Sequence, residues 1–265
     1  MNYKNIEFNI EGIAGTIWLN RPEVHNAMNA EMIAEIVDVF EKVNDMEDVR
    51  YVILRGRGKS FCAGADLNYM KGIAKFGLEE NYQDGLKLAK CFNVVYTCKK
   101  PTIAIVHGAA IGGANGLLAA CDIVYSMNDT KFAFSEVKLG IAPATISPYV
   151  CKRIGEFGAR DLMITGRRFL GIEAESVGLV NKSFETEEEL DEQMEFLHKM
   201  MISSGPAAMG ATKKLIYDLY NKFGFEDSID YTARLIAELR ASDEGQEGMA
   251  SFLEKRKTKW NVDEN

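Results

Sequence analysis

The chain has 265 residues, of which 47% are hydrophobic and 26% are charged, and it carries a formal net charge of -8 at pH 7. A chain of this length can bury one large core, or one core with an appendage. The acidic balance argues against nucleic acid as the main partner, because phosphate binding draws on clustered lysine and arginine.

The sequence also gives no support for a membrane protein or for a metal-binding protein. No uninterrupted apolar run approaches the roughly 18 residues of a membrane helix, and no segment has signal-peptide form. We therefore expect a cytoplasmic protein with no membrane partner. The five cysteines are scattered, without the paired spacing of zinc or redox sites, and the three histidines lack metal-ligand spacing. We expect no bound metal.

The first third of the chain predicts two strands and a helix. Residues 3–10 and 15–19 are apolar segments on either side of Gly12, a pattern that is typical of a strand pair. Apolar residues then recur at helical spacing over 32–43, and Asn29 is a good N-cap for that helix.

Two short apolar runs, 49–54 and 102–106, are rich in β-branched residues and indicate buried strands. Each leads to a turn of small residues, at 61–67 (FCAGADL) and at 111–117 (IGGANGL). We expect a helix over 117–120 whose amino end points at the second turn, where the helix dipole would favour a developing oxyanion.

Further strands are expected at 122–125 and 131–134, which places Glu136 just beyond a strand end. The alternation of strands and helices predicts an α/β fold. From about residue 187 the pattern changes to helices only, expected at 190–201, 207–223, 229–239 and 245–257.

The two small-residue turns and Glu136 together indicate a chemistry. Glycine and alanine let a substrate approach backbone N–H groups, which is how an oxyanion hole for a thioester carbonyl is built. Glu136 offers a carboxylate near these turns in the sequence, whereas Gly116 offers no side chain. The combination indicates proton transfer next to a stabilised enolate.

The chain resembles the enoyl-CoA hydratase/isomerase, or crotonase, superfamily from its amino terminus to Trp260. The resemblance implies a ββα spiral core over 1–186 and a C-terminal helical oligomerisation region over 187–265, in a homotrimer or homohexamer. Four motifs in the family's order carry it: LNRP with NAM at 19–28, the turn at 60–66, the turn at 108–122, and EGMASFLEKRK at 247–257.

The resemblance also implies roles for single residues. It makes Glu136 the catalytic carboxylate and assigns the oxyanion-hole amides to Ala63 and Gly113. Asp66 is equally well placed to cap the helix that follows it. The positions that the resemblance assigns to CoA binding are Ala65, Asp66, Leu67, Phe252 and Lys255.

Typical hydratases of this family carry two glutamates, and the first falls where this chain has Gly116. Residues 135–150 resemble the methylglutaconyl-CoA hydratase branch, whose members also tend to have glycine there. Our leading hypothesis is a hydro-lyase that reversibly adds water to a branched 2-enoyl-CoA with one glutamate. The alternatives are an isomerase that moves a proton between C2 and C4, and a non-catalytic or RNA-binding relative. CoA enters as part of the substrate, and no separate cofactor is expected.

Overall fold

The computed structural model describes residues 1–261. The chain forms two compact units. The predicted boundary after residue 186 stays a prediction, and residues 262–265 of the predicted C-terminal region lie outside the described residues. The first unit comprises residues 1–98 and 102–191, and the second comprises 99–101 and, among the described residues, 192–261.

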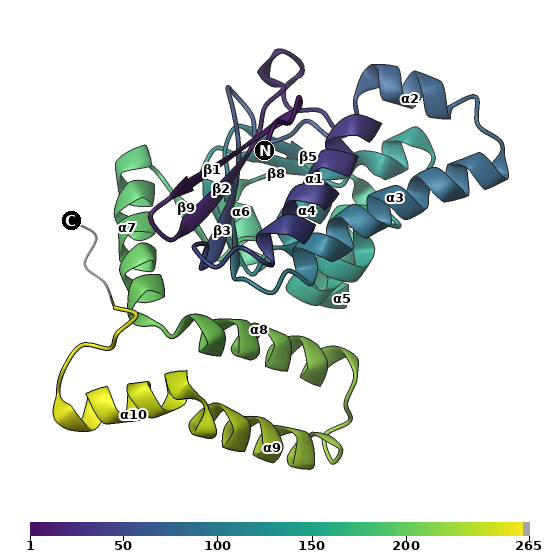
Figure 1. Ribbon diagram of the computed structural model, residues 1–265. Helices are drawn as coiled ribbons and strands as arrows, with labels where there is room; N and C mark the ends of the chain where they lie inside the picture. Colours follow the sequence, from purple (N-terminus) through teal and green to yellow (C-terminus); the bar gives the residue numbers. More distant parts are fainter. Residues whose placement is uncertain (262–265) are drawn as a thin grey trace. The chain divides into compact units, whose positions relative to one another are not determined.

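A six-stranded sheet lies at the centre of the first unit (Figure 1). Its first two strands form an antiparallel hairpin around Gly12, as predicted, and every other neighbouring pair is parallel. Every residue of β4 is buried, as expected for a central parallel strand. In spatial order the strands are β1 (Ile6–Glu11), β2 (Ala14–Leu19), β3 (Tyr51–Gly56), β4 (Thr102–Val106), β6 (Ile123–Met127) and β9 (Lys182–Phe184).

A second sheet of three short strands starts directly after β4. It consists of β5 (Ala109–Ile111), β7 (Lys131–Ala133) and β8 (Arg168–Leu170), with β7 in the middle. β5 is parallel to β7, and β8 is antiparallel to it. The strand at β7 was predicted, but β5 and β8 were not, because each becomes a strand by pairing with β7, which is distant from it in the sequence.

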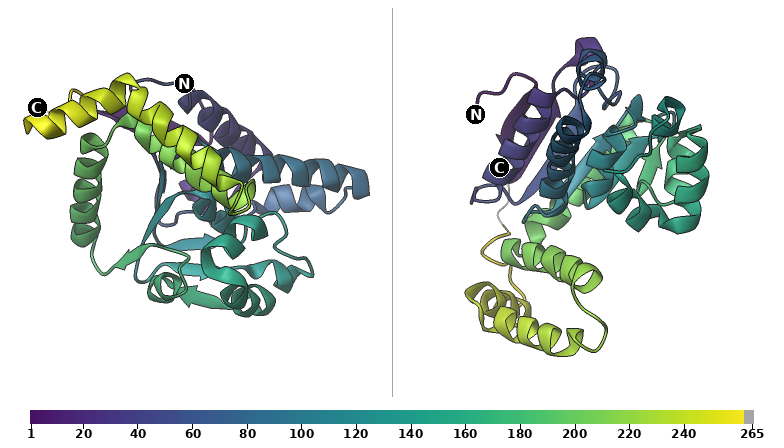
Figure 2. Two further views of the ribbon diagram at one scale, coloured as in Figure 1. Left: turned by 90° about the horizontal axis from the view of Figure 1, so that it is seen from below. Right: turned by 90° about the vertical axis from the view of Figure 1, so that its right-hand side faces the viewer.

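Helices pack on the sheets of the first unit. The Asn29 side chain accepts a hydrogen bond from Met32 N–H at 2.8 Å, which confirms the predicted N-cap. α3 lies beside α1 and also packs on α4 (Figures 1 and 2). The helices are α1 (Ala30–Val43), α2 (Leu67–Ile73), α3 (Leu78–Tyr96), α4 (Ala114–Ala120), α5 (Ser147–Thr165) and α6 (Gly171–Ser176), with 3-10 turns η1 (Pro22–Val24) and η2 (Ser135–Leu139).

The predicted all-helical end of the chain is confirmed. Asp218, 2% exposed, joins α8 to α9, because it accepts a hydrogen bond from Tyr231 Oη on α9 at 2.6 Å. It also pairs with Lys222, at the end of α8, at 2.8 Å. No helix within residues 1–261 is both long and apolar enough to cross a bilayer. The four helices are α7 (Glu187–Ser203), α8 (Pro206–Asn221), α9 (Ser228–Ala241) and α10 (Asp243–Glu254).

Candidate active site

The second small-residue turn joins β5 to α4, and α4 begins three residues before the predicted 117–120 helix. Gly112 has a φ of +55°, a left-handed conformation that favours glycine. The buried Asn115 side chain donates hydrogen bonds to the carbonyls of Ala110, Gly112 and Ala133. These bonds fix the turn and hold Gly113 at the N-cap of α4.

The first small-residue turn packs directly on β5. Cys62 N–H donates to Ala109 O at 3.0 Å, and Ile111 N–H donates to Cys62 O at 3.1 Å. Gly64 has a φ of +96°, and a Cβ at this position would lie 2.8 Å from Ile111 O. Only glycine fits so close an approach between the two backbones. The two turns that the sequence predicted as an oxyanion site therefore lie in direct contact.

The segment around His25 to Met28 clamps the first turn from its other side. Ala63 N–H donates to His25 O at 2.9 Å, and Met28 N–H donates to Gly64 O at 2.7 Å. The Ala63 amide already has a partner within the fold, so the geometry does not favour its predicted role as an oxyanion donor.

Two other amides of these turns are free. Within residues 1–261, the N–H groups of Ala65 and Gly113 have no hydrogen-bond partner. Ala65 is exposed and Gly113 is half-buried. The geometry therefore favours Ala65 over Ala63 as the donor that acts with Gly113.

Asp66 holds the first turn to its surroundings. One carboxylate oxygen accepts the N–H groups of Asn68 at 2.8 Å and Tyr69 at 3.1 Å, and the other accepts Arg21 Nη2 at 2.9 Å. Burial alone would raise the pKa of the Asp66 carboxyl, but these three donors outweigh it and lower the pKa. The predicted helix cap is confirmed. Both oxygens are already bonded, so the geometry favours a structural role over contact with CoA.

Glu136 lies in η2, facing the second turn. Its Oε1 is 3.5 Å from the position that a Cβ on Gly112 would occupy, and its Oε2 is buried with no hydrogen-bond partner in the described chain. Burial raises the pKa of this carboxyl, and its own backbone N–H offsets the effect only in part. A buried acceptor without a partner and with a raised pKa is suited to take a proton from a bound ligand.

Position 116 offers no room for a second carboxylate. A Cβ on Gly116 would lie 2.6 Å from Ile146 Cγ2 and 2.7 Å from Phe92 Cζ. Both of these side chains are buried. Hydrocarbon therefore occupies the place where typical hydratases carry their first glutamate.

The remaining predicted CoA contacts are divided between the two units. Leu67 begins α2 in the first unit and is 74% exposed. Phe252, 83% exposed, lies on α10 in the second unit, where Lys255 caps the helix in a left-handed conformation. Their exposure leaves them accessible to a ligand, and their contact with CoA stays a prediction.

A family model described as enoyl-CoA hydratase/isomerase matches residues 9–263. The chain belongs to this family. It is 33% identical to a crotonyl-CoA hydratase of Syntrophomonas wolfei subsp. wolfei, over 97% of this chain and 98% of the relative. It is 30% identical to a peroxisomal delta(3,5)-delta(2,4)-dienoyl-CoA isomerase of Arabidopsis thaliana, over 98% of each chain.

A solved structure shows the same fold. The crystal structure of an enoyl-CoA hydratase from Shewanella pealeana has a TM-score of 0.92 and 35% identity, and the match covers 97% of this chain and 96% of that one. The predicted crotonase fold, with its C-terminal helices, is therefore confirmed, and so is membership of a family of enoyl-CoA enzymes. The methylglutaconyl-CoA branch stays a hypothesis.

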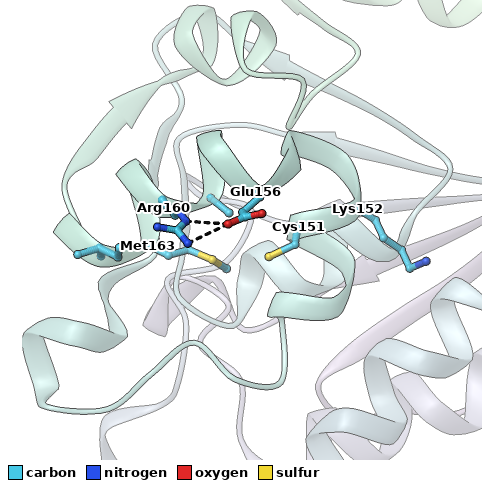
Figure 3. A pocket seen from close by; sticks show the side chains of 7 residues that line it. Cys151, Lys152, Glu156, Arg160 and Met163 are labelled. Carbon is cyan, nitrogen blue, oxygen red and sulfur yellow. Dashed lines mark hydrogen bonds and ion pairs between the residues drawn. The ribbon is translucent and has the colours of Figure 1, made fainter.

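Two other features of this enoyl-CoA hydratase/isomerase family member are a cysteine within the first turn and a surface pocket away from both turns. Burial raises the pKa of the Cys62 thiol to about 12, which does not suit a nucleophile. A surface pocket of about 490 Å³ on α5 (Figure 3) contains none of the site residues described above. In residues 1–261, no group of three or more His, Cys, Asp or Glu side chains could hold a metal ion. The pocket is lined by Cys151, Lys152, Glu156, Ala159, Arg160, Met163 and Ile164.

Proposed function

We propose that this protein reversibly adds water to a 2-enoyl-CoA thioester, with Glu136 as its only catalytic carboxylate. The observation that carries the proposal is the buried Glu136 Oε2, which has no partner within the described residues and whose carboxyl group faces the Gly112 turn. The next residue, Gly113, presents a free backbone N–H. An acid–base group and an oxyanion donor therefore adjoin one turn.

The proposed mechanism begins with the thioester oxygen accepting hydrogen bonds from the Ala65 and Gly113 amides. Glu136 accepts a proton from water as the water oxygen bonds to C3, and the electrons of the double bond move toward the thioester oxygen. The protonated Glu136 then gives its proton to C2, so the elements of one water are added and the carboxylate is regenerated. One oxyanion donor supplies about 2.7–4 kcal/mol of transition-state stabilisation.

A carboxyl with a raised pKa suits both halves of this cycle. Glu136 must first accept a proton and then donate it, and a group whose pKa is closer to the working pH does both more efficiently. The burial that raises its pKa therefore supports a single residue in the two roles that typical hydratases divide between two glutamates.

An isomerase is the second candidate. Removing a proton from C2 of a 3-enoyl-CoA and returning it to C4 needs only one base and no bound water. The hydrocarbon around Gly116 favours this reaction, because it offers nothing to hold water on that side. The similarity to the Arabidopsis dienoyl-CoA isomerase also supports it.

For the substrate, we propose a branched, methylglutaconyl-CoA-like acyl group, on the resemblance of residues 135–150. Ala65, Leu67, Phe252 and Lys255 remain the proposed CoA contacts. The homotrimer or homohexamer and the cytoplasmic location remain predictions, as does the absence of a nucleic-acid partner.

A substrate panel tests the proposed reaction. The purified protein is offered crotonyl-CoA, 3-methylglutaconyl-CoA and a 3-enoyl-CoA, and the products are resolved by mass. Gain of the mass of one water on a 2-enoyl substrate supports the hydro-lyase, and faster turnover of the branched substrate supports its specificity. Double-bond migration without a change of mass would replace the hydro-lyase with the isomerase. Equal turnover of straight and branched substrates would contradict the proposed substrate class.

A further inference from the structure

Two consecutive residues that are not glycine have a left-handed backbone in the segment that clamps the first turn. His25 has a φ of +53° and Asn26 has a φ of +56°. This conformation is costly for most side chains, although asparagine adopts it more readily than most. Such backbone strain persists only where the surrounding structure holds it, and it gathers at functional sites.

The Asn26 side chain supplies the contacts that hold this segment. It is fully buried, and its Nδ2 donates hydrogen bonds to Arg57 O and Ser60 O, both at 2.8 Å. Its Oδ1 accepts a hydrogen bond from Arg21 N–H at 2.8 Å. Arg57 directly follows β3, and Ser60 directly precedes the first turn. One side chain therefore fastens the clamping segment to the chain that enters the first turn.

Met28 carries this position to the free Ala65 amide. Met28 and Ala65 form an isolated parallel bridge. Met28 N–H donates to Gly64 O at 2.7 Å, and Met28 O accepts from Asp66 N–H at 2.9 Å. In parallel pairing these two bonds go to the neighbours of the paired residue, whose own N–H therefore points away from the partner strand. The bridge thus aims the Ala65 N–H away from Met28.

We propose that Asn26 is a positioning residue for the Ala65 oxyanion donor, a role that rests on the proposed enoyl-CoA chemistry. Asn26 acts through the backbone and does not contact the substrate. Its left-handed conformation turns the chain between the His25 carbonyl, which accepts the Ala63 N–H, and Met28, which brackets Ala65. An oxyanion donor is effective only where its N–H lies close to the developing charge, so a shift of this segment should weaken it.

The first test measures the polarisation of a bound thioester in wild type and Asn26→Asp. The aspartate keeps the shape and an acceptor oxygen, but it cannot donate to Arg57 O and Ser60 O. The ligand is butyryl-CoA, isotopically labelled at its thioester carbonyl, which has no double bond to hydrate or move. Wild type should lower the carbonyl stretching frequency below that of the free ligand, and Asn26→Asp should retain less than about half of this shift. A shift equal to that of wild type would overturn the proposal.

The matched control is Val43→Ala. Val43 is also fully buried, on α1, and its hydrocarbon side chain makes no hydrogen bond to either turn. The variant should unfold at a lower temperature and keep the wild-type carbonyl shift, because infrared difference spectra report only on bound ligand. A loss of the shift as large as that in Asn26→Asp would assign the effect to general destabilisation and would overturn the proposal.

Hydrogen–deuterium exchange tests the positioning without any ligand, by comparing Asn26→Gly with Asn26→Ala. Both variants lose the side-chain bonds, but only alanine is disfavoured at a φ of +56°. Peptides covering residues 61–67 should exchange at least about tenfold faster than in wild type, and fastest in Asn26→Ala, while peptides from α5 stay unchanged.

Exchange of residues 61–67 within about twofold of wild type in both variants would overturn the proposal. Equal exchange in the two variants would overturn the part assigned to the left-handed conformation. If wild type does not shift the butyryl-CoA carbonyl, the proposed oxyanion site fails, while the exchange experiment still decides whether Asn26 holds the first turn.

Discussion

Two carboxylates flank the paired turns, and the fold treats them in opposite ways. Asp66 has both oxygens bonded, to two backbone amides and to Arg21, and its pKa is lowered. Glu136 has a buried oxygen without a partner in the described chain, and its pKa is raised by burial. A carboxylate whose bonds are complete stabilises the backbone around it, whereas one left incomplete is available to a ligand.

The comparison assigns the two residues to different tasks within a small region. Asp66 keeps the first turn in the conformation that exposes the Ala65 amide, and Glu136 performs proton transfer. Substitutions at the two positions should therefore separate stability from activity, and the following experiments test that separation.

The largest effect is expected from Glu136→Gln. The amide keeps the shape of the side chain but cannot accept and return a proton, so kcat should fall by about 10²- to 10⁴-fold with little change in KM. Steady-state kinetics on the preferred enoyl-CoA measures this. A variant that retains more than about a tenth of wild-type kcat would show that another group carries the proton.

Gly64→Ala tests the turn on the Asp66 side of the comparison. Its φ of +96° and the 2.8 Å approach to Ile111 O leave no room for a Cβ. We expect a loss of about 1–3 kcal/mol in the free energy of unfolding from backbone strain, together with lower activity as the turn shifts. Denaturant unfolding and kinetics check both effects. Gly72→Ala is the control, because no atom lies within 4 Å of its Cβ position. Full activity in Gly64→Ala would contradict the role of this turn.

Asp66→Ala should act mainly on stability. Loss of the helix cap costs about 0.5–2 kcal/mol, and the partner Arg21 is left without its carboxylate. Urea unfolding measures the change. Asp66→Asn keeps an oxygen that can cap α2 and should recover part of the stability. Equal losses in the two variants would show that the charge, and not the cap, is what matters.

The two carboxylates should also respond to pH in opposite directions. Asp66 has a lowered pKa, so its stabilising effect is present above the pKa of the unfolded state and is lost as pH falls through the folded-state pKa. Glu136 has a raised pKa in the folded state. Its carboxyl therefore destabilises the fold least at a pH below the pKa of the unfolded state, and stability is lost as pH rises through the pKa of the folded state.

Unfolding curves of wild type, Asp66→Asn and Glu136→Gln from about pH 2 to about pH 8 measure these trends, because the Asp66 effect is lost only below the ordinary carboxyl pKa. The deficit of Asp66→Asn should shrink toward acid pH. Glu136→Gln should gain stability over wild type as pH rises. An advantage of Glu136→Gln that is the same at every pH would contradict a raised pKa for this glutamate.

Much of this site follows from sequence pattern, and the rest depends on contacts between distant segments. The strand runs and small-residue turns predict where the two loops begin, and Asn29 predicts a helix start. The choice between the Ala63 and Ala65 amides could not be made from sequence, because it depends on the His25 carbonyl. The strands β5 and β8 were not predicted, because they form by pairing with β7, which is distant from each of them in the sequence.

The hydrocarbon around Gly116 is a second feature that the sequence alone could not predict. The sequence shows that no carboxylate stands at this position, but it does not show what fills the space. Phe92 and Ile146 lie 24 and 30 residues away along the chain (116 − 92 and 146 − 116) and meet at Gly116 only because α3, α4 and α5 pack together. Contacts of this kind are set by tertiary packing, which local patterns do not specify.

The most direct test of the central claim is a mass-resolved reaction in deuterated water with crotonyl-CoA, comparing wild type with Glu136→Gln. One-glutamate hydration predicts a product that gains one heavy water and carries a single deuterium bound at C2, and it predicts that this product is nearly absent in the variant. Water addition at the wild-type rate by Glu136→Gln, or a product that shows only double-bond migration, would contradict it.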